Sequence, residues 1–429
     1  MIRKIGFVIA CLICVPGMYA QDGSTSPYSY FGLGDIRESS TVENQMMGGI
    51  GMYADSIHIS LNNPAAYGKL GVQVRDNFSL TTYTAGISHK QVRYKSYGEE
   101  QSSSITNLDY LALGVSLKKG LGVGFGIRPY TSVGYNFETL DGVEGARTLN
   151  RYSGKGGLNK VFASVGYEIV KNLSLGVTVN YNFGTLEREV IQGRENVQFD
   201  SRDKKSSRID GVDLNYAANY TPAINDTHTL YTSLRINTQA NLSARNTQET
   251  GSYSLATGQD ISVNQVDLES MGLKETGVKI PTTTTLGLGY GENMKWFLGI
   301  EYSFQKLSDL SNEFLEFENL VYDNATTIAL GGFYTPDRNS FESYFKRMTY
   351  RAGFRYGETG MIVNSKHIKN LGITFGVGLP LGNYPSNLNL GFELGRTGTS
   401  AGNLVEESYF KVNVGLSLND QWFQKRKIN

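Results

Sequence analysis

Apolar and polar residues alternate with a period of two along most of the chain. Leu173, Leu175, Val177, Val179, Tyr181 and Phe183 are separated by Ser, Gly, Thr or Asn residues. The same pattern recurs over 371–379 and 410–418. Because successive side chains of a strand point to opposite faces, this pattern predicts strands with one apolar face and one polar face.

Fourteen such segments follow one another. They span, to within a few residues, 76–92, 105–118, 121–138, 152–170, 172–189, 207–221, 227–245, 281–291, 295–307, 321–336, 347–358, 367–380, 387–399 and 405–419. Short connections such as Lys171-Asn172 alternate with long polar ones such as 247–280. An even strand number with alternating short turns and long loops is typical of outer-membrane barrels. We therefore predict an all-β fold: a transmembrane antiparallel β-barrel of about fourteen strands over residues 76–423.

Composition supports a membrane barrel over a soluble sandwich. The chain has 27 Tyr and 50 Gly but only 9 Pro, and aromatic residues cluster near the ends of the segments, as in an interfacial girdle. The less apolar face carries charged residues, whereas the other face stays apolar. After the N-terminal leader no run of about 18 apolar residues occurs, so we expect no spanning helix.

Both ends of the chain carry short special segments. Residues 1–20 have a basic start at Arg3 and Lys4, an apolar stretch and a break at Pro16-Gly17, which is typical of a signal peptide cleaved after Ala20. Residues 424–429 form a basic tail. We expect export to the outer membrane of a Gram-negative bacterium, with both mature termini in the periplasm.

Cysteine and charge exclude several function classes. The two cysteines, Cys11 and Cys14, both lie in the leader, so the mature chain is expected to hold no disulfide and no zinc-thiolate site. Removing Arg3 and Lys4 from the 40 basic residues leaves 38 against 40 acidic ones. This balance gives no electrostatic footprint for nucleic acid.

The stretch 54–70 belongs neither to the leader nor to the strands. Asn63 can cap a helix through its side-chain oxygen, and Pro64 is favoured at a first helical position. Ala65 then allows close packing. We interpret residues 21–75 as an N-terminal periplasmic segment and a hatch inside the barrel. The alternative is an ordinary Asn-Pro turn before a strand.

Arg128-Pro129 lies inside the third predicted strand. Proline cannot donate to a strand ladder, so the strand must bulge or open there. Together with Asn63, Pro64 and Ala65, these two residues form the predicted substrate pathway. The alternative is a bulge at the membrane rim with no role in transport.

The predicted lumen face also carries charged residues. They are Arg128, Arg235, Glu301, Arg351, Arg355, Glu393 and Lys411. In a narrow barrel such residues are expected to pair with one another or with the hatch, and direct ligand binding is the alternative.

No catalytic pattern stands out, and we predict that the chain is not an enzyme. His58, His89, His228 and His367 show no ligand spacing to one another or to carboxylates. The sequence GVGFG at 122–126 alternates inside a strand and is not followed by a helix, so it does not match a dinucleotide fingerprint. We expect no metal and no cofactor.

The chain resembles the long-chain fatty-acid transporter (FadL-type) family of outer-membrane proteins. The residues that carry the resemblance are Met47-Gly48-Gly49-Ile50-Gly51, Ala54-Asp55, Asn63-Pro64-Ala65, Ile280-Pro281, Leu286-Gly287-Leu288-Gly289-Tyr290 and Trp296. The resemblance implies a fourteen-stranded barrel with an N-terminal hatch. It also implies uptake of hydrophobic molecules that leave sideways through a kink in the third strand. The regions 333–355 and 409–422 are more similar to a subgroup that includes barrels of secretion machinery.

Two functions follow as hypotheses. The first is an outer-membrane channel for passive uptake of hydrophobic small molecules such as fatty acids, in contact with outer-membrane lipids. The second is an accessory barrel that binds other outer-membrane proteins in a secretion or assembly machine. A hydrophobic lumen pocket beside the third-strand opening would favour the channel. A filled lumen with unusual exposed periplasmic loops would favour the accessory barrel.

Overall fold

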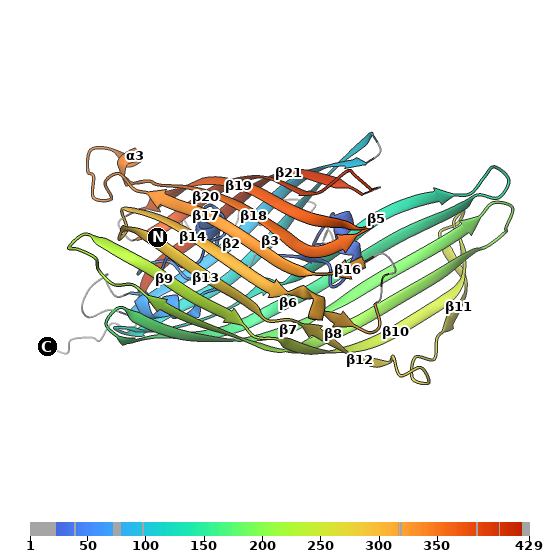
Figure 1. Ribbon diagram of the computed structural model, residues 1–429, viewed down its shortest axis with the longest axis horizontal. Helices are drawn as coiled ribbons and strands as arrows, with labels where there is room; N and C mark the ends of the chain where they lie inside the picture. Colours follow the sequence, from blue (N-terminus) through green and yellow to red (C-terminus); the bar gives the residue numbers. More distant parts are fainter. Residues whose placement is uncertain are drawn as a thin grey trace.

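A single antiparallel sheet closes on itself to form a barrel (Figure 1). The computed structural model describes residues 23–422 except 38–39, 72–78, 97, 316, 318–319, 383–384 and 403. The predicted signal peptide, the junction at 72–78 and the basic tail therefore lie outside the described residues. The last strand, β21, pairs with the first wall strand, β2, from Ser79↔Trp422 to Lys95↔Glu406, so the wall begins and ends at the same end of the barrel.

Seventeen of the described strands build this wall. They are β2 (Ser79–Ser96), β3 (Glu99–Lys118), β4 (Leu121–Pro129), β5 (Thr131–Asp141), β6 (Thr148–Val170), β7 (Leu173–Arg194), β8 (Asp200–Tyr220), β9 (His228–Asn237), β10 (Ala240–Ser254), β12 (Glu275–Ile280), β13 (Thr283–Glu292), β14 (Trp296–Lys306), β17 (Asn324–Tyr334), β18 (Thr349–Val363), β19 (Lys366–Leu381), β20 (Ser386–Gly398) and β21 (Glu406–Trp422). In three places, β4–β5, β9–β10 and β12–β13, two consecutive strands together make a single crossing of the wall with a short break between them. The seventeen described strands therefore cross the wall fourteen times, in agreement with the predicted fourteen-stranded barrel.

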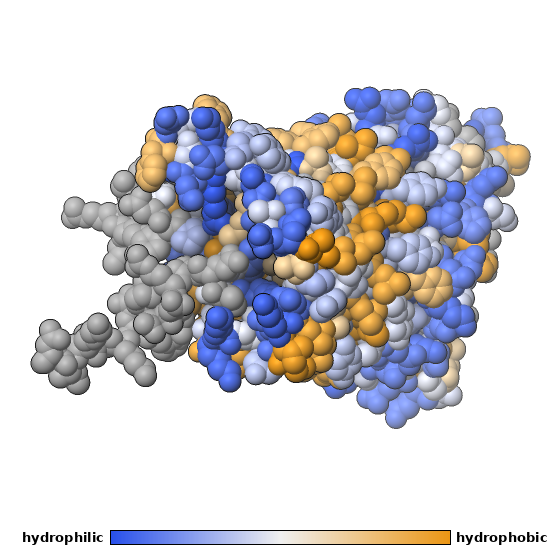
Figure 2. Space-filling view, turned by 60° about the vertical axis from the view of Figure 1, so that its left-hand side comes forward, coloured by the Kyte–Doolittle hydropathy of each residue, from blue (hydrophilic) through white to orange (hydrophobic). Residues whose placement is uncertain are grey.

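The two faces of the wall follow the predicted alternation. On β7, Leu175 and Val179 are 42% and 48% exposed, whereas Thr178 and Asn180 are 2% and 3% exposed. On the face that Figure 2 shows, hydrophobic side chains gather in a band between more hydrophilic ends. The outward residues of β14 run from Trp296 through apolar residues to Phe304, about 27 Å along the strand. This band matches the hydrocarbon layer that an outer-membrane barrel spans.

Several strands extend farther than predicted at the long-loop end. The interval 247–280, which we expected to be a polar loop, holds the end of β10, β11 (Gln259–Gln265) and β12. β10 pairs with β8, β11 and β12 there. Polar residues still pair in this region because backbone hydrogen bonds do not need an apolar face. β15 (Ser311–Asn312) and β16 (Leu320–Tyr322) are short strands of another loop at this end.

The N-terminal segment, residues 23–71, lies inside the barrel rather than beyond its end. It contains η1 (Pro27–Tyr30), β1 (Asp35–Ile36), α2 (Val42–Gln45) and η2 (Pro64–Lys69). Glycines on the inner wall make room for its backbone: a Cβ at Gly353 would lie 2.1 Å from the Gly48 nitrogen. None of the described helices is both long enough and apolar enough to cross a membrane.

Candidate functional site

The turn at Asn63 packs against the wall as expected, but Asn63 does not cap it. Pro64 begins η2, a 3-10 helix, and the side-chain oxygen of Asn63 accepts no capping hydrogen bond. Instead, its Nδ2 donates to the Gly51 carbonyl at 2.9 Å and to Asn219 of β8 at 3.1 Å. The prediction of a side-chain cap was therefore wrong, because these two acceptors orient the amide away from the helix.

Ala65 makes the close approach that its small side chain predicted. It is 0% exposed, and a Cβ at Gly176 of β7 would lie 2.4 Å from the Ala65 nitrogen. Tyr67 of the same turn lies against Gly124 of β4, whose added Cβ would lie 2.2 Å from the ring. Glycines of the wall and small or flat residues of η2 thus fit together without an intervening space.

Charged side chains of the inner wall form hydrogen bonds with the N-terminal segment. Arg235 of β9 pairs with Glu301 of β14, and Glu301 also accepts a hydrogen bond from the Gly51 backbone N–H at 2.9 Å. Lys411 of β21 donates to Gln45 of α2 at 3.4 Å. The charged residues of the wall therefore contact the N-terminal segment as well as other residues of the wall.

A second charged group lies on β18, β20 and β21. Arg355 donates to Glu393 at 2.8 Å, and the Tyr409 hydroxyl donates to the same carboxylate at 2.8 Å. Arg351 donates to Asn389 at 3.1 Å, and Asn389 donates to Glu43 of α2 at 2.7 Å. The structure therefore places Arg235, Glu301, Arg351, Arg355, Glu393 and Lys411 in polar contacts with the wall or with residues 23–71.

The wall ladder is interrupted at Pro129. β3 pairs with β2 on one side over most of its length, but on the other side it pairs with β4 only from Leu111 onward. Beyond the proline, β5 pairs with β6 and, through Thr131 and Ser132, with β1 of the N-terminal segment. Among the described residues, no pairing joins β3 to β5. Arg128, beside the proline, is 8% exposed.

A cavity of about 470 Å³ adjoins this interruption. Thr131 and residues of β1 line it, together with charged side chains of β2, β3 and β21, including Lys90, Asp109 and Glu407. Arg37 pairs with Asp109 at 3.3 Å within it. The cavity beside the third-strand interruption therefore combines several charged side chains with apolar ones such as Leu33, Ile36 and Leu307.

Farther toward the long-loop end, an apolar cluster fills part of the lumen. Leu33 of the N-terminal segment is buried there among residues of β5, β6, β7, β8, β10 and β12 and three loop residues, Leu268, Phe314 and Leu315. Arg188 of β7 donates to the carbonyl groups of Tyr30 at 2.6 Å and Gly32 at 2.5 Å. These contacts fix the start of the N-terminal segment to the wall.

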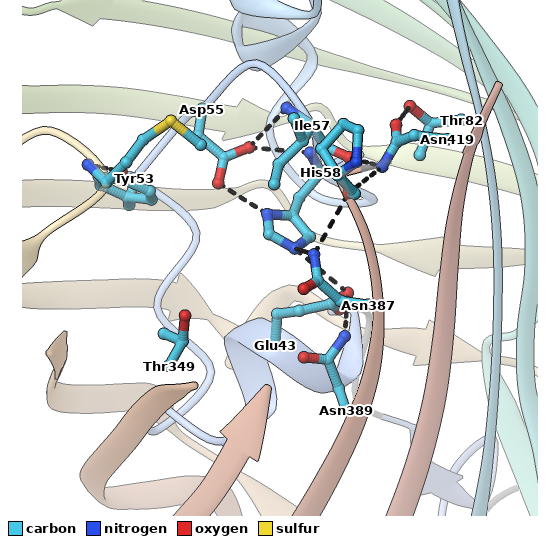
Figure 3. A network of polar contacts seen from close by, with 12 residues as sticks. Glu43, Tyr53, Asp55, Ile57, His58, Thr82, Thr349, Asn387, Asn389 and Asn419 are labelled. Atoms are coloured by element: carbon cyan, nitrogen blue, oxygen red, sulfur yellow. Dashed lines mark hydrogen bonds and ion pairs between the residues drawn. The ribbon is translucent and has the colours of Figure 1, made fainter. Parts of the chain in front are cut away.

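A second cavity, of about 700 Å³, opens at the short-turn end. The His58 ring Nδ1 lies 2.7 Å from Asp55, and its Nε2 lies 3.4 Å from the Asn387 amide nitrogen (Figure 3). Asp55 also accepts backbone hydrogen bonds from Ile57 at 3.0 Å and His58 at 2.8 Å. Burial opposes ionisation of Asp55, but the His58 ring and these N–H groups outweigh it and lower the pKa to about 2.

The sequence reasoning missed this group. We found no ligand spacing between the histidines and carboxylates, yet Asp55 precedes His58 by three residues and lies 2.7 Å from its ring. The spacing Asp55-x-x-His58 was the available signal, because a turn brings side chains at that separation together. Among the described residues, no group of three or more His, Cys, Asp or Glu side chains could hold a metal ion.

Solved structures with the same fold are hydrocarbon transporters and a FadL homologue. The Pseudomonas putida toluene transporter TodX is 16% identical, with a TM-score of 0.56, over 92% of this chain and 100% of that chain. A Pseudomonas aeruginosa FadL homologue is 14% identical, with a TM-score of 0.54, over 91% and 99%. The Ralstonia pickettii toluene transporter TbuX is 13% identical, with a TM-score of 0.52, over 89% and 98%. At these identities the similarity shows the fold: a FadL-type outer-membrane barrel.

The search of curated proteins found no match to this chain, whereas the search of family models did. The family model BamG matches residues 1–429, the whole of the sequence. The chain therefore belongs to the BamG family.

Proposed function

We propose that this chain is an accessory β-barrel subunit that binds protein partners in an outer-membrane assembly or secretion machine. The observation that carries the proposal is that several charged side chains line the cavity beside the third-strand interruption. Arg37, Asp109 and Lys90 line that cavity, where a hydrophobic solute would have to pass. The name of the BamG family is compatible with such a subunit.

The energetic argument concerns desolvation. An apolar solute that enters this cavity would remove water from charged groups and offer no hydrogen bond in return, which is unfavourable. The N-terminal segment would also have to break contacts with the wall, such as those of Asn63 and Arg188, before a continuous path opened. In this proposal residues 23–71 are a fixed plug that gives the barrel a defined shape. The outer surface of the barrel binds the partner proteins.

The test combines purification with transport. The tagged full chain is extracted from its native outer membrane in mild detergent, and co-purifying proteins are identified by mass spectrometry. The purified barrel is then placed in liposomes and toluene influx is measured. We expect stoichiometric partner proteins and influx no greater than that of empty liposomes. Toluene influx without any co-purifying protein would refute the proposal.

A passive channel for hydrophobic small molecules is the second candidate, and the interruption at Pro129 favours it. Because β3 and β5 share no pairing, a solute could leave sideways between them. The variant Pro129→Val restores a backbone donor at this point of the strand. Pro222→Val, in the turn between β8 and β9, is the matched control. A channel predicts that only Pro129→Val lowers toluene influx, whereas a partner-binding barrel predicts the same background influx for both.

A further inference from the structure

The longest described connection at the short-turn end joins β17 to β18. This rim segment, residues 336–348, contains α3 (Tyr344–Arg347) and projects at the edge of the barrel (Figure 1). The other turns at this end, such as 119–120 and 293–295, are much shorter. A tight turn would suffice to connect adjacent antiparallel strands, so the additional residues need another explanation.

The rim segment exposes aromatic rings on an ordered backbone. Phe345 is 70% exposed and Tyr344 is 41% exposed. The Asp337 N–H donates to the Lys346 carbonyl at 2.8 Å, and the Met348 N–H donates to the Phe345 carbonyl at 3.4 Å. Met348 is buried and anchors the end of the segment. The rings are therefore presented to the surroundings by a fixed loop.

Two tyrosine hydroxyls tie the segment to the outward face of the wall. The Tyr350 hydroxyl donates to the Phe345 carbonyl at 3.1 Å, and the Tyr344 hydroxyl donates to the Pro380 carbonyl of β19 at 3.1 Å. Tyr350 is an outward residue of β18, and its register partner on β17 is the outward Tyr334. Outward tyrosines at a strand end mark the membrane interface. Phe345 thus lies directly beside the lipid-facing surface of the barrel.

Cationic side chains accompany the exposed rings. The Arg347 guanidinium lies 5.2 Å from the centre of the Tyr344 ring. Lys346 is exposed, and its partner Glu342 lies at 3.8 Å in a solvent-exposed pair. Aromatic rings beside lysine and arginine are typical of surfaces that insert shallowly among phospholipid headgroups.

We propose that the rim segment is an interfacial anchor. Tyr344 and Phe345 enter the headgroup and acyl boundary of the adjacent leaflet, while the exposed Lys346 contacts phospholipid phosphates. The occupant is the phospholipid surface that already surrounds the barrel wall. This inference does not depend on the proposed function, because a channel or a partner-binding subunit could carry the same anchor.

Depth-dependent quenching tests the anchor. The only cysteines of the chain lie in the predicted leader, so single cysteines can be introduced into the mature protein and labelled with a fluorophore. The positions are Phe345→Cys, the wall control Leu330→Cys and the loop control Met271→Cys, which is 60% exposed near the opposite end. The full-length proteins are reconstituted in phosphatidylethanolamine and phosphatidylglycerol vesicles. Heat-modifiable migration on gels confirms that each barrel is folded.

The label at 345 should be quenched by a lipid-borne quencher at least about threefold more strongly than the label at 271, and less strongly than the label at 330. Aqueous iodide should show the reverse order. Equal iodide access at 345 and 271 in vesicles would overturn the proposal. Shielding at 345 that appears only in native outer membranes would also overturn it, because a protein would then be the occupant. Co-purification of partners with wild-type protein is a separate readout.

Discussion

At the scale of single residues, the charged and amide side chains of the lumen have specific partners. Asn63 bridges the Gly51 backbone and the wall, and Asp55 orients the His58 ring. The sequence showed which residue types face inward but not which partner each one meets. Asn63 illustrates the limit: its capping preference is local, whereas its observed acceptor Asn219 lies 156 residues away. Long-range contacts of this kind override local propensities.

The pKa of Asp55 gives a prediction on pH. Its value in the fold, about 2, is below the value of about 3.9 for an unfolded chain. Ionised Asp55 therefore contributes stability that is fully present above about pH 4 and is lost as the pH falls toward 2. Asp55→Asn should lower the unfolding temperature in detergent at pH 7, and its difference from wild type should shrink across that window. Asp226→Asn, in an exposed turn, is the control. A difference that stays constant from pH 7 to pH 2 would contradict the role assigned to Asp55.

At the scale of elements, the pattern of alternation predicted the wall well and the lumen poorly. Leu175 and Thr178 were assigned to the correct faces, and Pro129 marked a real interruption in the third crossing of the wall. The outer ends of β7 and β8 were predicted too short, because residues such as 190–194, which read Val-Ile-Gln-Gly-Arg, carry no two-residue period. The path of residues 23–71 could not be derived, since it depends on where glycines of distant strands leave room.

Those glycines provide a prediction on the contact between the N-terminal segment and the wall. Gly353→Val would place side-chain atoms where the Gly48 backbone lies, so the segment should be displaced and become sensitive to protease. The barrel wall should persist, because its ladder is closed through β2 and β21. Gly277→Ala, where an added Cβ meets nothing within 4 Å, is the matched control. Limited proteolysis followed by mass spectrometry reads out both. Equal resistance of the two variants would show that this close approach does not hold the segment.

At the scale of the whole molecule, the two ends of the barrel differ. One end has extended strands and long loops, whereas the other has short turns and the rim segment. This asymmetry, together with the apolar band, gives the barrel one expected orientation, with the short turns in the periplasm.

Cysteine labelling of intact cells checks that orientation. Thr257→Cys, in the exposed turn between β10 and β11, should react with an impermeant maleimide. Lys171→Cys, in the turn between β6 and β7, should react only after the outer membrane is opened. Both positions are exposed, so access differs only by side of the membrane. Labelling of Lys171→Cys alone in intact cells would reverse the assignment.

Closure of the wall around residues 23–71 has a consequence for the order of folding. The segment is made first, yet Glu43 is hydrogen-bonded to Asn389 and Ser26 to Glu407, partners 346 and 381 residues later in the chain. Once β2 and β21 are paired, the ladder leaves no seam between the first and last strands through which the segment could enter. We therefore expect the segment to be enclosed by the growing sheet before β20 and β21 complete its contacts. Contacts of such separation are slow to form, and a truncated chain that lacks β20 and β21 would leave this early-made segment without its last partners.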